Sequence, residues 1–134
     1  MIIDAKDAIL GRLSARVAKE LLKGNQIVVI NSEKIVISGN PDAVLKRYKE
    51  KRARRDTHKG PFTPRYPDRI LKRTVRGMLP YKKERGSSAL KKLKVYIGNP
   101  DNLKGITMGK TADDLSFKYI TLEKLCKGLG AKLD

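Results

Sequence analysis

The stretch that most resembles a catalytic motif lies near the C-terminus. It reads Gly105-Ile-Thr-Met-Gly-Lys-Thr111, and its Gly-Lys-Thr end is typical of the loop that cradles nucleotide phosphates. That loop needs four residues between its two glycines, whereas this stretch has three. Only 23 residues follow Thr111, too few for the strands and the second acidic metal-binding site of a nucleotide hydrolase. We therefore predict no hydrolase site here.

Other catalytic residue types occur alone. A dinucleotide site would need three spaced glycines after the first strand, where only Gly11 is available. His58 is the sole histidine, so neither a zinc site nor a histidine-based triad can be assembled. Cys126 is the only cysteine, which excludes an intramolecular disulfide, and its neighbouring leucines indicate a buried core residue. We predict no enzymatic activity, no cofactor and no small-molecule substrate.

Three carboxylates near the N-terminus could bind a metal ion, as in a nuclease. These are Asp4, Asp7 and Glu33. They sit beside expected helix starts and strands, where capping and local salt bridges explain acidic residues more simply. We therefore predict no metal site.

The strongest functional signal is positive charge. The chain has 31 Lys and Arg against 14 Asp and Glu, a net charge of +17, well above the magnitude of about 2 to 8 that suits a soluble small domain. Such a field indicates a polyanionic partner, which could be RNA, DNA or an anionic membrane. The longest purely apolar stretch is Ile27–Ile30, far short of the roughly 20 residues of a membrane span. The N-terminus also lacks a secretion signal, so we expect a cytoplasmic protein.

The charge is concentrated between residues 46 and 92. This segment holds 18 Lys and Arg and 4 Asp and Glu, a net charge of +14, whereas the rest of the chain holds 13 and 10. Phe62 and Tyr66 are interleaved with its cations. Forked guanidinium donors suit phosphates and aromatic faces suit unstacked bases, so RNA fits better than duplex DNA. The residues that we predict to contact RNA are Arg52, Arg54, Arg55, Lys59, Arg65, Arg69, Arg73, Arg76, Lys82, Lys83 and Arg85.

Alternatives to this interpretation remain open. The segment could be a solvated charged helix followed by a loop, and the whole chain could be a DNA-compacting protein or a nucleotide-dependent enzyme built on a parallel sheet. For Tyr81 we consider two roles, stacking on a nucleotide and covering its own turn.

The first half of the chain predicts a strand, a helix and a second strand. Ile2 and Ile3 open as a short buried strand, and a helix over 8–23 follows, with Asp7 as its cap and Gly24 as its stop. Residues 27–30 are apolar without alternation, which indicates a strand covered on both faces in a parallel sheet.

The basic segment should follow a second short strand. Residues 35–37 are β-branched, and Asn40 then caps a helix over 41–54 whose far end we expect to project away from the core. Prolines and Gly60 break 55–67 into a loop that we expect to order on binding. The remaining expected elements are a helix from about 68 with Ile70, Leu71, Val75 and Met78 inward, a helix near 84–92, a strand over 95–97 and a helix over 122–127.

Three separated blocks resemble one known family. The first is Leu10-Gly-Arg-Leu-Ser-Ala-Arg-Val-Ala-Lys-Glu-Leu-Leu-Lys-Gly24, and the second is Ile27-Val-Val-Ile-Asn-Ser-Glu-Lys-Ile-Val-Ile-Ser-Gly39. The third is Arg76-Gly-Met-Leu-Pro-Tyr-Lys-Lys-Glu-Arg-Gly86, followed by Leu93-Lys-Val-Tyr-Ile-Gly98. Together they are similar to the L13 family of large-subunit ribosomal proteins. Asn99-Pro100 and the basic insert before Asp68 resemble the archaeal and eukaryotic members.

This resemblance implies a fold and a function. The fold would be an α/β domain over 1–134, with three α/β/α layers, a small mainly parallel sheet and a basic helix-loop extension. The chain would be a non-catalytic constituent of the large ribosomal subunit that binds and organises large-subunit rRNA during assembly, beside neighbouring ribosomal proteins. The turn around Pro80, with Lys82, Lys83 and Arg85, would lie against RNA.

Overall fold

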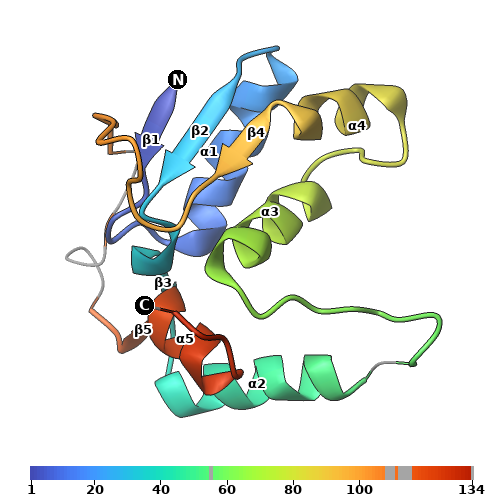
Figure 1. The fold of residues 1–134 in the computed structure, drawn as a ribbon, viewed down its shortest axis with the longest axis vertical. Coiled ribbons are helices and arrows are strands. Elements are labelled where there is room, and N and C mark those ends of the chain that lie inside the picture. Colours follow the sequence, from blue (N-terminus) through green and yellow to red (C-terminus); the bar gives the residue numbers. More distant parts are fainter. Residues whose placement is uncertain (55, 108–110, 112–115, 134) are drawn as a thin grey trace.

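A three-stranded parallel sheet lies at the centre of the upper half of the molecule (Figure 1). The computed structural model describes residues 1–54, 56–107, 111 and 116–133. The sheet order is β1 (Ile2–Asp4), β2 (Ile27–Ile30), β4 (Leu93–Val95), so β2 is central and pairs in parallel on both sides. The predicted α/β class with a small, mainly parallel sheet is confirmed.

Helix cover on the two faces of this sheet is unequal. α1 (Leu10–Leu22) runs behind the sheet and buries the face that carries Ile3, Val29 and Leu93 (Figure 1). The opposite face carries Val28, which is half-buried, and Lys94, which is exposed. The apolar stripe predicted for α1 is confirmed, since its members Leu10, Leu13, Val17 and Leu21 are buried while the arginines of α1 are exposed.

A second, antiparallel pair of strands lies below the parallel sheet. β3 (Val36–Ser38) pairs with β5 (Tyr119–Thr121), and η1 (Ser32–Lys34) connects β2 to β3. β5 leads directly into α5 (Leu122–Gly128), where the Thr121 hydroxyl accepts the Lys124 backbone N–H at 3.4 Å.

The basic segment spans three helices. α2 (Pro41–Ala53) begins as predicted, with the Asn40 side-chain oxygen accepting the Asp42 N–H at 3.0 Å. The 54–66 loop then joins α2 to α3 (Pro67–Gly77), and a turn joins α3 to α4 (Glu84–Lys91). The loop extends outward from the end of α2 and turns back to α3, so α2 lies below α3 in this view and the loop joins them at one side (Figure 1).

Three local predictions are wrong. Asp7 does not cap α1, because the helix begins at Leu10 and Asp7 itself adopts a left-handed conformation with φ of +59°. The last parallel strand is Leu93–Val95 rather than 95–97, because it starts directly after α4. Met78 does not point inward: it is 44% exposed, and Leu79 is buried instead because α3 ends before this turn.

The core is aliphatic. Most buried side chains from Ile3 to Ala131 form one cluster that includes Cys126, and Ile9 and Val36 form a small second cluster. Burial, aided by the nearby Asp68 carboxylate, raises the pKa of the Cys126 thiol to about 12. The predicted packing role of this cysteine is confirmed, since the side chain has no exposed surface.

Candidate nucleic-acid interface

The predicted RNA-contacting residues lie on α2, the 54–66 loop, α3, the 78–83 turn and the start of α4. Of these residues, Arg52 is half-buried and Arg55 lies outside the described residues. The exposed members are Arg54, Lys59, Arg65, Arg69, Arg73, Arg76, Lys82, Lys83 and Arg85. We call the surface formed by the described members the basic surface.

The positive charge of the basic surface is uncompensated by nearby acids. Lys23 pairs with Glu20 at 3.3 Å, and Lys127 pairs with Glu123 at 3.0 Å, both outside residues 46–92. Within the described part of the chain, no arginine or lysine of the basic surface forms an ion pair. Because the field is unneutralised, the surface attracts polyanions.

Two of the predicted RNA-contacting arginines also support the loop. Arg52 of α2 donates a hydrogen bond from Nη1 to the Thr63 carbonyl oxygen at 3.4 Å. Arg73 of α3 donates from Nη1 to the adjacent Phe62 carbonyl oxygen at 3.1 Å. The two helices therefore hold consecutive carbonyls of the loop from opposite sides.

Cations also lie over aromatic rings on this surface. The Lys51 ammonium is 5.2 Å from the centre of the Tyr48 ring, and the Arg76 guanidinium is 4.5 Å from that of Tyr81. Tyr81 thus packs against Arg76 at its turn while 39% of its surface stays exposed, so both roles considered for it are compatible with the geometry.

Close packing fixes the turn that carries Lys82 and Lys83. Gly86 on α4 is buried against this turn, and a Cβ added there would overlap the Pro80 carbonyl group and lie 2.7 Å from the Tyr81 nitrogen. The Lys83 N–H also donates to the Pro80 oxygen at 3.0 Å. Only glycine lets α4 begin this close to the turn.

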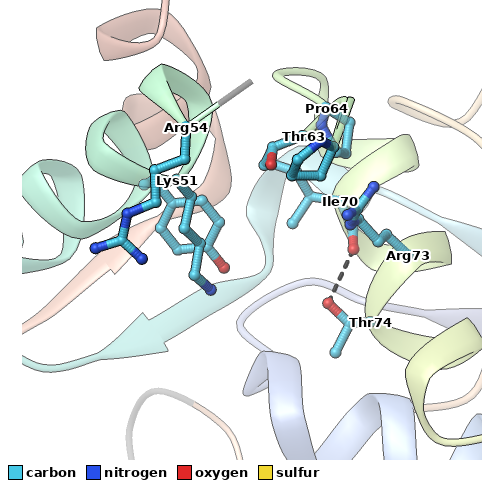
Figure 2. Close-up of a pocket in the computed structure, with 9 residues that line it drawn as sticks. Lys51, Arg54, Thr63, Pro64, Ile70, Arg73 and Thr74 are labelled. Atoms are coloured by element: carbon cyan, nitrogen blue, oxygen red, sulfur yellow. Dashed lines mark hydrogen bonds between the residues drawn. The ribbon is translucent and has the colours of Figure 1, made fainter. Parts of the chain in front are cut away.

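Two hollows flank the loop. A cavity of about 420 Å³ lies between α2 and α3, and a groove of about 740 Å³ lies on the other side of residues 62–64. Figure 2 shows Lys51 and Arg54 on one side of the cavity and Arg73 and Thr74 on the other. The cavity is lined by Tyr48, Lys51, Arg54, Pro61, Thr63, Pro64, Ile70, Arg73 and Thr74.

Several residues that line these hollows were absent from the predicted set. Tyr48 and Lys51 line the cavity, and Lys72 lines the groove. Burial raises the pKa of the Tyr48 hydroxyl. Spacing could have indicated both lysines, because Lys51 directly precedes Arg52 and Lys72 lies one turn of α3 before Arg76. No sequence signal separates Tyr48 from an ordinary core residue.

The residues considered for catalysis or metal binding have local structural roles. One Asp4 carboxylate oxygen accepts the Lys6 N–H and the Asn31 side-chain amide, each at 3.0 Å, and the Glu33 carboxylate accepts the Gly98 N–H at 2.8 Å. No cluster of three His, Cys, Asp or Glu side chains suited to a metal occurs among the described residues.

The stretch compared with a phosphate-binding loop lies partly outside the described residues, at positions 108–110. Its first glycine, Gly105, has a packing role at the edge of the sheet. A Cβ there would come within 2.6 Å of the Asp4 nitrogen. The next residue, Ile106, accepts the Asp4 N–H at 3.0 Å and extends the sheet beyond β1.

A search of the described helices for a membrane span found none with the necessary length and hydropathy.

Comparison with known proteins gives a consistent result. The family model described as ribosomal protein L13 matches residues 1–102. The large ribosomal subunit protein uL13 of Methanocaldococcus jannaschii is 50% identical, over 98% of this chain and 98% of that protein. The uL13 of Archaeoglobus fulgidus is 49% identical over 96% of this chain and 86% of its own length, and that of Haloarcula marismortui is 42% identical over 98% and 91%.

Proposed function

This chain belongs to the ribosomal protein L13 family, and from that membership we infer that it is a structural, non-catalytic constituent of the large ribosomal subunit. It resides with that subunit in the cytoplasm. We propose large-subunit rRNA and neighbouring large-subunit proteins as its partners, and we propose that the basic surface makes the contacts to rRNA.

The proposal that the basic surface contacts rRNA rests on its cations, which form no ion pairs within the described chain. Arg54, Arg65 and Arg69 are exposed, and none forms an ion pair or a side-chain hydrogen bond within the described chain. Guanidinium groups without such partners keep their N–H donors available for phosphates, and this includes Arg65, whose guanidinium lies 5.9 Å from the centre of the Tyr66 ring. The aliphatic core and the loop-supporting arginines then fix the spacing between these cations.

The energetic basis is the release of counterions. Each phosphate neutralised by Arg or Lys releases condensed cations, so log affinity falls linearly with log salt by roughly 0.7 to 0.9 per contact. The test uses the full chain, purified large-subunit rRNA and a triple variant, Arg54→Gln, Arg65→Gln and Arg69→Gln. We expect the slope to flatten by about 2 to 3 in this variant.

A matched control removes the same charge elsewhere. Arg12→Gln, Arg16→Gln and Lys19→Gln neutralise three exposed cations on α1, outside the basic surface. The α1 variant should keep most of the wild-type slope. Equal slopes in the wild type and the basic-surface variant would refute rRNA binding by this surface. A duplex DNA that competes as well as rRNA would instead favour the DNA-compacting alternative.

A further inference from the structure

We infer that the cavity between α2 and α3 holds one unstacked nucleotide of the RNA strand that crosses the basic surface. This inference rests on the proposed function and adds a binding mode to it. The volume of about 420 Å³ is within the roughly 300 to 1,000 Å³ of small-ligand sites. That is space for one nucleotide and not for a base-paired helix.

The lining separates into an apolar interior and a cationic rim. Ile70 is buried, Tyr48 is half-buried, and Pro61 and Pro64 contribute ring surfaces. An unstacked base buries two apolar faces when it enters such a space, and aromatic side chains are its usual stacking partners. The interior therefore fits a base better than it fits phosphate alone.

The rim supplies the charge that a nucleotide needs. Lys51 and Arg54 project from α2 and Arg73 from α3, so cations approach the cavity from both sides (Figure 2). Thr74 Oγ1 donates to the Ile70 carbonyl oxygen at 2.9 Å, and its oxygen can still accept from a ribose hydroxyl or a base amine. The apolar interior therefore suits the base, the polar wall suits the ribose, and the cationic rim suits the phosphate.

Residues 62–64 form the wall between the two hollows, and this wall is held in place and gives the RNA strand a path. Thr63, Pro64 and Arg73 line both the cavity and the groove. The carbonyls of residues 62 and 63 are fixed by the hydrogen bonds from Arg73 and Arg52. A strand with one base in the cavity can therefore continue over this wall, where Arg65, Arg69 and Arg76 of the groove meet its next phosphates.

The experiment fills the cavity without changing the charge. The full chain is compared with Thr74→Phe, which places a ring in the cavity, and with Thr107→Phe, which makes the same change at an exposed site outside both hollows. Tyr48→Leu is a second variant that removes the ring and keeps the charge. Affinity for purified large-subunit rRNA is measured across a salt series, and ultraviolet crosslinking maps nucleotide adducts on the protein.

We expect Thr74→Phe and Tyr48→Leu to weaken rRNA binding by about 5- to 100-fold, the loss of one stacked base, with the salt slope unchanged. The wild type and Thr107→Phe should bind equally and crosslink at Tyr48. The inference is overturned if the wild type binds with the expected salt slope while both cavity variants bind equally well. It is also overturned if adenosine or uridine monophosphate alone binds the cavity at micromolar concentration, since the site would then serve a free nucleotide. If the wild type shows no salt-dependent rRNA binding, the proposed function itself has failed.

Discussion

Gly86 sets how closely α4 approaches the turn at residues 79–81. The Gly86→Ala variant places a methyl group against the Pro80 carbonyl, and the backbone must shift because no flexible side chain can move aside. We expect a loss of about 1 to 3 kcal/mol in the free energy of unfolding, measured by urea denaturation. Gly11→Ala is the matched control, because nothing lies within 4 Å of its added Cβ. Equal stability of Gly86→Ala and wild type would contradict the packing described here.

Cys126 links stability to alkaline pH. Its pKa is raised to about 12 in the folded chain, chiefly by burial, against 9.0 for an ordinary thiol. Between these values the unfolded chain loses the proton while the folded chain keeps it. The free energy of unfolding should therefore fall as pH rises from about 9 toward 12, by up to about 1.4 kcal/mol per pH unit from this group.

The Cys126→Ala variant tests this linkage. Its unfolding free energy, measured by urea denaturation at about pH 8.5, 9.5 and 10.5, should fall less steeply than that of the wild type. The variant will be less stable at every pH because a buried sulfur is lost, so the slopes are compared rather than the absolute values. Parallel slopes would show that the thiol does not contribute.

Individual side chains of the site were only partly predictable from the sequence. The concentration of charge identified the surface, because like charges with few acids among them need an external partner. Sequence could not show that Arg52 and Arg73 turn toward carbonyls of their own loop. Each lies beside a lysine, Lys51 or Lys72, and whether its guanidinium also bonds to a loop carbonyl depends on where the loop returns in space.

At the level of elements, the 54–66 loop depends on the helices at its two ends. Arg73→Met should remove the hydrogen bond to Phe62 and loosen the loop, while the core, which contains neither residue, stays folded. We expect faster tryptic cleavage after Lys59 or Arg65, with a nearly unchanged thermal midpoint. Arg69→Met is the control, because the Arg69 guanidinium lies on the same helix but forms no hydrogen bond within the described chain. Equal cleavage rates in the two variants would show that Arg73 does not hold the loop.

The helix cap at Asn40 provides a second test at this scale. Its side chain accepts the Asp42 N–H at the start of α2, so Asn40→Ala should cost about 1 kcal/mol of stability. Asn40→Ser should recover most of it, because a hydroxyl can accept the same bond. Urea denaturation of the three proteins measures the difference. If Ala and Ser are equally destabilising, the cap does not stabilise α2.

Elements with a long or unmixed pattern were predictable, and short ones were not. Continuous β-branched residues identified β2, and the spacing of leucines identified α1. β5 was missed because three residues, Tyr119–Thr121, are too few to show alternation, and their pairing with β3 is set by a contact more than 80 positions away in sequence. The predicted ends of α3 and β4 differ from the observed ends because the chain turns at Met78 and at Tyr96.

On the scale of the whole molecule, a nearly neutral fold carries one strongly basic segment. Residues 46–92 hold a net charge of +14 out of +17, and the remaining residues supply most of the buried cluster. We propose that the chain folds as one domain. Because most of the core comes from outside residues 46–92, the chain can stay folded while the basic surface binds rRNA.

Lysine reactivity in assembled large subunits tests this account most directly. An amine-acylating reagent is applied to the free chain and to intact subunits, and modification of Lys59, Lys82 and Lys83 is quantified by mass spectrometry. All three are exposed in the chain alone, so all should react there. The account predicts that they are protected in the subunit and become reactive again when high salt releases the protein. Full reactivity of these lysines within the intact subunit would contradict it.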